Sequence, residues 1–299
     1  MIAEYSFQAM GTACRVVIDV PDRTEVDDVA QQAIDEVYRL EETYSRYRDD
    51  SFLSEINRSC GMGKTVIIDP ETSFLLDYAA EAWRLSEGAF DVTSGILRRV
   101  WRPDADVASI DASLAVLRPH IGFDKVVREG DRLSFAVTDV ELDFGGLVKE
   151  YAADRAVAVC RSQGIQAGLI DLGGDIAVIG PQLGERPWPI AIASVPGQTN
   201  SLPPVLLSHG GIATSGDYAR GLRIGDKTYS HILDARTGLP TTGLASVTVI
   251  APTAMAAGTL ATLAMLRGAD GAVWLKARGC RFLAIDSGGS LQTSSDWSA

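Results

Sequence analysis

The sequence predicts an α+β fold, in which strands run mostly as meanders and helices flank them. Segments with the spacing of amphipathic helices mix with strand-like runs, without the regular strand-helix cadence of a doubly wound parallel sheet. The 299 residues, 46% of them hydrophobic, can bury a large core. No linker or low-complexity stretch interrupts the chain. We therefore expect one continuous domain over residues 1–299, and a division into two lobes stays open.

The first half of the chain is predicted to be mainly helical. Residues 25–45 carry apolar side chains at the spacing of a long amphipathic helix. Ser51 is placed to cap a short helix, and Asp69 and Pro70 are placed to open another. The other elements expected here are a strand over residues 5–20, a helix over 71–86, a loop after Gly88, a small helix over 109–117 and a strand meander over 125–142.

The second half is predicted to alternate between strands and helices. Residues 135–142 resemble a strand, and a glycine pair leads from it into a helix over residues 149–163. An Ala-rich run over residues 253–266 predicts another helix. The further strands expected in this half cover residues 167–171, 187–193, 204–207, 229–233 and 246–251.

Composition excludes several classes of function. The net charge is -12, and the clustered Lys and Arg that bind phosphate backbones are absent, which argues against a nucleic-acid partner. No apolar run reaches the roughly 18 residues of a membrane span, and the N-terminus lacks a signal-peptide pattern. We expect a cytoplasmic protein without membrane insertion, or a periplasmic one if a leader was removed. Four reduced, mostly buried thiols are expected at Cys14, Cys60, Cys160 and Cys280, which form no CxxC pair.

The most informative motif joins the strand-like run at 135–142 to the helix that follows. Gly145 and Gly146 let a ligand approach bare backbone, and the next amides point out of a helix N-terminus, where an anion is favoured. Asp143 before the glycines and Lys149 after them add a carboxylate and an ammonium group. The segment therefore predicts a site for a phosphorylated ligand. A plain strand-to-helix turn with a buried close approach is the alternative.

A second motif places a histidine and an aspartate three residues apart. His231 has polar neighbours that can orient an imidazole for proton transfer, and Asp234 is one of them. His120 and His209 are interpreted as structural. Residues 210–218 are small and hydroxyl-rich, so their backbone can pass close to a ligand. A structural role for His231 is the alternative.

Two residues of the first half suggest a planar ligand. Tyr47 follows the long helix, and Asp91 lies in the loop after Gly88. An aromatic ring and a carboxylate together can stack on a heterocycle and hydrogen-bond it. Core packing and capping are the alternative interpretation. The motifs of P-loop proteins, α/β-hydrolases and HExxH zinc proteases do not occur in the sequence.

Eight segments follow one another in a recognisable order along nearly the whole chain. They are Ala-Met-Gly-Thr at residues 9–12, the polar run at 45–57, Gly-Ala-Phe-Asp-Val-Thr at 88–93, residues 121–126, residues 143–155, Asp-Leu-Gly-Gly-Asp at 171–175, residues 213–218, and Ser-His-Ile-Leu-Asp at 230–234 with Thr237-Gly238. Together they resemble the FAD:protein FMN transferases, the ApbE family. The resemblance implies a single α+β, T-fold-related unit.

The resemblance also implies a reaction. Members of the family bind FAD, use Mg²⁺ to split its pyrophosphate and pass FMN to a Thr or Ser hydroxyl of an acceptor flavoprotein, while AMP leaves. Such phosphoryl transfer depends mainly on positioning and charge neutralisation. By matching position, the residues expected to contact the flavin nucleotide are Met10, Tyr47, Ala89, Phe90, Asp91, Asp143, Lys149 and the backbone of Ile232.

The matching positions further imply catalytic and metal-binding residues. The Gly146 carbonyl and Thr262 are expected to bind the metal. His231, steered by Asp234, is expected to accept the proton of the acceptor hydroxyl.

One position departs from the family pattern. An Ala-Asp-Ala-Leu-x-Thr helix start corresponds here to residues 257–262, and Gly258 stands where the metal-ligand Asp is expected. Mg²⁺ usually takes at least one carboxylate, so the site should be weaker unless phosphate oxygens, waters or another acid compensate. The alternatives are an FAD-binding protein with weak or no transferase activity, or a Mg²⁺-dependent FAD pyrophosphatase. Glu150 stands where many members have Gly, a variation without an expected consequence.

Overall fold

The computed structural model describes residues 1–22, 26–193, 202–217 and 221–297, and its centre is one eight-stranded sheet. Neighbouring strands of this sheet are antiparallel throughout, which confirms the predicted α+β class. In spatial order the strands are β1 (Ile2–Ala9), β2 (Thr12–Asp19), β6 (Gly168–Leu172), β7 (Asp175–Gly180), β10 (Gly211–Gly216), β15 (Leu244–Ala251), β16 (Arg281–Asp286) and β17 (Leu291–Thr293).

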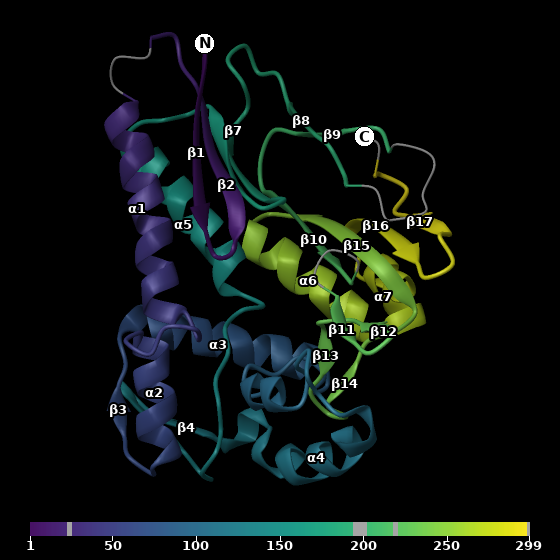
Figure 1. The fold of residues 1–299 in the computed structure, drawn as a ribbon. Coiled ribbons are helices and arrows are strands. Elements are labelled where there is room, and N and C mark those ends of the chain that lie inside the picture. Colours follow the sequence, from purple (N-terminus) through teal and green to yellow (C-terminus); the bar gives the residue numbers. More distant parts are fainter. Residues whose placement is uncertain (23–25, 194–201, 218–220, 298–299) are drawn as a thin grey trace.

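Helices cover one face of the sheet, and a small hairpin covers the other (Figure 1). The helices are α1 (Asp27–Tyr44), α5 (Val148–Ser162), α6 (Ala254–Leu266) and α7 (Gly271–Ala277), and the hairpin strands are β8 (Trp188–Ile190) and β9 (Val205–Leu207). Successive side chains of a strand point to opposite faces. Ile170 and Leu172 therefore join the core under the helices, whereas Leu169 packs with β8 and β9.

A second group of elements lies at the end of the molecule opposite β8 and β9 (Figure 1). Its members are α2 (Phe52–Gly61), α3 (Pro70–Leu85), α4 (Ile110–Leu117), β3 (Val66–Ile67), β4 (Val126–Glu129) and β5 (Arg132–Phe135). The hydrophobic core is continuous between the two groups, because Ile56 of α2, Leu75 of α3 and Ile170 of β6 belong to one cluster of buried side chains.

Short elements complete the fold. Two strand pairs are β11 (Leu222–Ile224) with β12 (Lys227–Tyr229), and β13 (Leu233–Asp234) with β14 (Leu239–Pro240). The 3-10 helices span Gly95–Arg99, Val107–Ser109, Arg118–His120, Phe123–Lys125 and Gly268–Asp270.

The helix predictions are confirmed within a few residues, because local signals define these helices. Ser51 accepts a hydrogen bond from the Ser54 amide (3.0 Å) at the start of α2, and Asp69 accepts one from the Thr72 amide (2.7 Å) at the start of α3. Helices α1, α3, α4, α5 and α6 correspond to the expected ranges. Glu25, where the first helix was expected to begin, lies outside the described residues.

Two strand predictions are wrong because a turn interrupts them. Residues 5–20 form the hairpin of β1 and β2, in which Met10 and Gly11 turn the chain with φ values of 51° and 70°. Residues 229–233 are divided between β12 and β13, and the Ser230 hydroxyl between them accepts a hydrogen bond from the Ile232 amide (3.2 Å).

The strand expected over residues 135–142 is also wrong. β5 ends at Phe135, and the chain then runs to Leu142 with only an isolated bridge at Glu141. The Asn57 side chain accepts a hydrogen bond from the Leu142 amide (2.8 Å) and donates one to its carbonyl (2.9 Å). One side chain thus supplies the hydrogen bonds that a neighbouring strand would supply.

The hydroxyl-rich segment expected to pass a ligand contains β10, a strand inside the sheet. A Cβ added to Gly211 would lie 2.3 Å from the Ala254 amide nitrogen, so glycine is required where β10 passes the start of α6. Tyr218, the last residue of the segment over 210–218, lies outside the described residues.

None of the described helices is long and apolar enough to cross a membrane. The cysteine prediction is confirmed, since all four thiols are free, with Cys14, Cys60 and Cys160 buried and Cys280 partly buried.

Candidate active site

The glycine-pair turn before α5 forms the centre of the candidate site. Asp143 accepts a hydrogen bond from the Gly145 amide (2.8 Å) and forms an ion pair with Arg46. Gly145 and Gly146 are exposed, and Leu147, the N-cap residue of α5, provides no side-chain cap. The amides of Leu147 and Val148 donate hydrogen bonds to the Phe144 carbonyl, both at 2.9 Å. The N-terminus of a helix carries a partial positive charge, so this terminus is suited to an anion.

The loop over residues 88–93 packs against this turn. A Cβ added to Gly146 would lie 3.2 Å from Cε2 of Phe90, so the absence of a side chain makes room for the ring. The Ala89 carbonyl accepts a hydrogen bond from the Ala235 amide (2.9 Å), which joins the loop to the hairpin of β13 and β14. Segments far apart in the sequence thus meet at the turn.

The Asp91 carboxylate holds its own loop together. It is 5% exposed and accepts hydrogen bonds from the Thr93 amide (2.8 Å), the Thr93 hydroxyl (2.6 Å) and the Phe123 amide (2.8 Å). Burial raises the pKa of this carboxyl, and the hydrogen bonds oppose the rise. Tyr47 is 79% exposed, and its hydroxyl accepts a hydrogen bond from Arg46 (3.0 Å). Contacts of Asp91 and Tyr47 with a flavin stay predictions.

Lys149 is held by a buried acidic side chain. Its ammonium group contacts Oδ2 of Asp175, which is 2% exposed, and Oδ1 of Asp175 accepts a hydrogen bond from the Thr214 amide (3.1 Å). These contacts connect α5 to β7 and β10. They also keep a cation beside the uncapped start of α5, where a phosphate would be stabilised.

Helix α6 forms the second wall of the site, and α5 fixes its position. The Asp154 carboxylate accepts hydrogen bonds from the amides of Ala254 and Met255, both at 2.9 Å. The Thr253 hydroxyl accepts one from the Ala256 amide (3.1 Å). The first turn of α6 is therefore fully capped.

The predicted metal-binding helix face contains hydroxyl groups and one neighbouring carboxylate. The Thr262 hydroxyl lies 2.9 Å from that of Ser215, and Gly258, one turn earlier, is buried against the Glu150 side chain. Oε2 of Glu150 is buried without a hydrogen-bond partner among the described residues. These hard oxygens suit Mg²⁺. No group of three or more His, Cys, Asp or Glu forms a metal centre in the described ranges, so a cation would also use hydroxyl, carbonyl and ligand oxygens.

The segment of His231 lies between β12 and β13, and the histidine is exposed. Asp234 is paired with Arg236, whose Nη2 lies 2.6 Å from Oδ2. The Ile232 carbonyl accepts a hydrogen bond from the Thr241 amide (2.9 Å). Asp234 thus stabilises the turn by its ion pair with Arg236. The expected orientation of His231 by Asp234 stays a prediction.

Met10 lies in the turn between β1 and β2. Its amide donates a hydrogen bond to Oε1 of Glu41 on α1 (2.6 Å), and its side chain packs against the main core. A contact with flavin stays a prediction for this residue.

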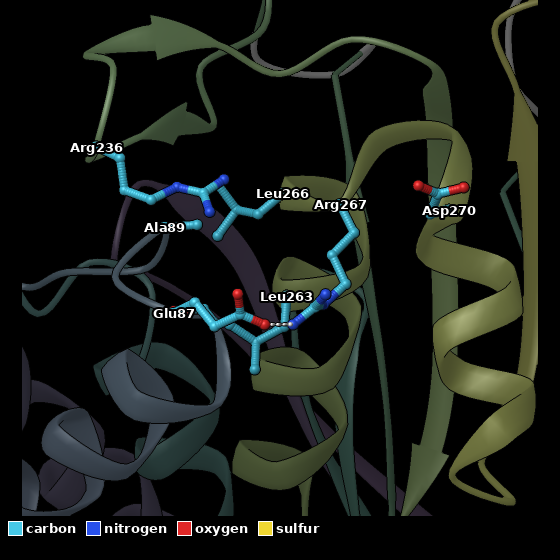
Figure 2. Close-up of a pocket in the computed structure, with 8 residues that line it drawn as sticks. Glu87, Ala89, Arg236, Leu263, Leu266, Arg267 and Asp270 are labelled. Carbon is cyan, nitrogen blue, oxygen red and sulfur yellow. Dashed lines mark hydrogen bonds and ion pairs between the residues drawn. The ribbon is translucent and has the colours of Figure 1, made fainter.

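A cavity of about 200 Å³ lies between the end of α6 and residues 86–89, which follow α3 (Figure 2). Arg236 and Arg267 reach toward it from opposite sides, and Arg267 is paired with Glu87 at 3.5 Å. The lining residues are Ser86, Glu87, Ala89, Arg236, Leu263, Leu266, Arg267 and Asp270. Both guanidinium groups are paired with carboxylates, Arg236 with Asp234 and Arg267 with Glu87, so the cavity carries charges of both signs.

Sequence reasoning gave no role to Arg46, Glu150, Asp154 and Asp175, although all four lie within or beside the motifs that it singled out. The resemblance offered one signal for Glu150, because it implies Gly in many members at this position and Asp at position 258. The connection between these two positions is a tertiary contact, which local pattern does not reveal.

Known proteins resemble this chain over almost all of its length. The model of the ApbE family matches residues 10–284. An FAD:protein FMN transferase of Vibrio cholerae is 31% identical over 254 residues, covering 83% of this chain and 74% of that protein. Another, of Haemophilus influenzae, is 28% identical, covering 91% and 82%.

Solved structures agree with the sequence comparison. The ApbE protein of Thermotoga maritima has a TM-score of 0.88 at 28% identity and covers 99% of this chain and 97% of its own. The flavin transferase ApbE of Vibrio cholerae has a TM-score of 0.86 at 28% identity, covering 99% and 98%. Both the fold and the resemblance seen in the motifs are thereby confirmed, and the chain belongs to the ApbE family.

Proposed function

We propose that this chain is an FAD:protein FMN transferase, which moves FMN from FAD to a Thr or Ser hydroxyl of an acceptor protein and releases AMP. One observation carries the proposal. Relatives with this activity in their names match most of the chain. The turn before α5 supports it, because Phe90 and Arg46 from distant segments meet there. FAD is thus the substrate, and the acceptor is a second protein.

The turn before α5 has the properties needed to bind the pyrophosphate of FAD. Its helix terminus has no side-chain cap, and the Lys149 ammonium is held beside it by Asp175. Asp143 is fixed by Arg46 and by the Gly145 amide, so its carboxylate is oriented before a nucleotide arrives.

A divalent cation is part of the proposal. Bound Mg²⁺ supplies charge neutralisation for the pyrophosphate in such a transfer. The Gly146 carbonyl and the Thr262 hydroxyl would hold it, beside the buried carboxylate of Glu150.

His231 would accept the proton of the acceptor hydroxyl. The acceptor oxygen bonds to the phosphorus of the FMN portion, and the bond from that phosphorus to the AMP oxygen breaks. The hydroxyl proton passes to the imidazole, and AMP carries away the bonding electron pair. The exposed position of His231 leaves room for a second protein to approach it.

The test uses purified protein, FAD, Mg²⁺ and a candidate acceptor, with AMP release and covalent flavin fluorescence as readouts. Covalent flavin on the acceptor supports transfer, and AMP with free FMN supports the pyrophosphatase alternative. Intact bound FAD without AMP contradicts both enzyme activities. In an active protein, His231→Asn should lower the transfer rate by roughly 100-fold or more, whereas His209→Asn should not.

A further inference from the structure

Glu150 is a buried acid beside the proposed cation, and the proposed reaction has so far given it no role as a metal ligand. The residue is 9% exposed, and its Oε2 is buried without a hydrogen-bond partner among the described residues. The nearest cation is Lys149, whose Nζ lies 4.0 Å from Oε1 but contacts Asp175 directly. A buried carboxylate oxygen without a partner is costly, so this oxygen is suited to a bound cation.

The Glu150 side chain occupies the space that a side chain at position 258 would fill. A Cβ added to Gly258 would lie 2.6 Å from Cγ of Glu150, 2.9 Å from Cδ and 2.9 Å from Oε1. Real Cβ contacts are essentially never this short. A side chain at position 258 would therefore have to displace the Glu150 side chain from the place that it occupies here.

The surroundings of this carboxylate match a cation site. Gly258 and Thr262 are four residues apart on α6 and so share a helix face, and the Thr262 hydroxyl lies 2.9 Å from that of Ser215. Gly146 lies four residues before Glu150, in the turn that precedes α5, and is exposed. A carboxylate, hydroxyl groups and a carbonyl are the oxygen types that bind Mg²⁺.

We propose that Glu150 supplies the acidic metal ligand in this chain, replacing the Asp that the family motif places at position 258. The acidic ligand is then attached to α5 instead of α6, and its carboxylate reaches the same cation site. In this chain, Gly258 leaves space for the Glu150 side chain. In the family motif, Gly at position 150 would leave the same space for Asp at position 258. This inference rests on the proposed function, since that function places Mg²⁺ here.

The test measures binding of Mn²⁺, with and without FAD, by the electron paramagnetic resonance signal of the free ion. Loss of a group that only supports a metal ligand lowers affinity roughly 10- to 100-fold. We therefore expect Glu150→Gln to weaken Mn²⁺ binding by at least about tenfold. The matched control is Glu36→Gln, because Glu36 has a side-chain exposure of 13% against 12% for Glu150 and lies on α1.

The exchanged double variant Glu150→Gly with Gly258→Asp gives the sharper result. It should regain Mn²⁺ affinity to within a few-fold of the starting protein, whereas Glu150→Gly alone should not. Gly258→Asp alone should not tighten binding, because the new side chain has to displace the Glu150 carboxylate that already occupies this place. If Glu150→Gln fails to fold, the comparison between the double variant and Glu150→Gly replaces it.

Unchanged Mn²⁺ affinity in Glu150→Gln, or no recovery in a folded double variant, would overturn the inference. A starting protein that binds no Mn²⁺ with or without FAD would overturn it together with the proposed metal dependence. If no acceptor becomes flavinylated but Mn²⁺ binding follows Glu150 as described, the transfer function fails and the inference stands.

Discussion

The two helices that form the walls of the candidate site begin in different ways. Helix α5 follows an exposed glycine pair and has no side-chain cap, whereas Thr253 and Asp154 cap the first turn of α6. Lys149, Glu150 and Asp154 all lie in the first half of α5, while Ala254–Leu266 contains no charged residue. One wall, α5, thus supplies the charge and a helix terminus without a side-chain cap, and the other, α6, supplies shape and hydroxyl groups.

The uncharged wall nevertheless depends on the charged one. Asp154 of α5 accepts hydrogen bonds from the amides of Ala254 and Met255 at the start of α6. This contact fixes where Gly258 and Thr262 of α6 lie relative to α5. If the comparison is right, removing charges from α5 should cost more stability than removing a cap from α6.

The largest effect on stability is expected for Lys149→Met. The change leaves Asp175, which is 2% exposed, without its cation, and an unpaired buried charge is strongly destabilising. We expect a loss of about 3 kcal/mol in the free energy of unfolding, measured with urea. Lys276→Met, at an exposed position in the last turn of α7, should stay within about 0.5 kcal/mol. Equal effects of the two substitutions would contradict the role given to the ion pair.

A smaller effect is expected for Asp154→Ala. The substitution leaves the amides of Ala254 and Met255 without acceptors, which should cost about 2 kcal/mol of unfolding free energy. Thr253→Ala removes the acceptor of one amide only and should cost about 1 kcal/mol. Urea unfolding of both variants ranks them. An Asp154→Ala variant no less stable than Thr253→Ala would show that α5 does not fix α6.

The difference between local and tertiary contacts explains which parts of the fold the sequence could predict. Helices and their caps were predictable, because Ser51 and Asp69 act on amides three residues away. The run over residues 135–142 was predicted to be a strand, but the backbone of its last residue, Leu142, is hydrogen-bonded by the Asn57 side chain and not by a neighbouring strand. Apolar alternation reports burial, and it does not identify the hydrogen-bond partner.

The site shows the same limit more strongly. The resemblance marked Gly258 as a lost ligand and Glu150 as a variation of no consequence, whereas the structure places the Glu150 side chain over Gly258. Taken alone, Gly258 suggests a defective metal site and Glu150 suggests a neutral substitution. Only the packing of α5 on α6 reveals that the two positions share one volume.

The smallest effect is expected in the pH dependence of stability. Burial raises the pKa of the Asp154 carboxyl, the hydrogen bonds from Met255 and Ala254 oppose the rise, and the charge of Glu150 adds to it. The folded protein therefore holds this proton more tightly than the unfolded chain does. The resulting stability is fully present below the unfolded pKa, about 3.9, and is lost as the pH rises through the folded value.

Asp154→Asn isolates this contribution, because the variant does not titrate at the position. The unfolding free energy of the unmodified protein minus that of Asp154→Asn should fall as the pH rises from about 3 toward neutrality. The comparator is Asp50→Asn, because the hydrogen bond from Arg48 lowers the pKa of the exposed Asp50. Any difference in unfolding free energy between the unmodified protein and Asp50→Asn should therefore rise with pH. If the difference in unfolding free energy between the unmodified protein and Asp154→Asn stays constant or grows with pH, the start of α6 does not bury this carboxyl. The assignment of the charge to α5 and of the uncharged wall to α6 would then lose its main support.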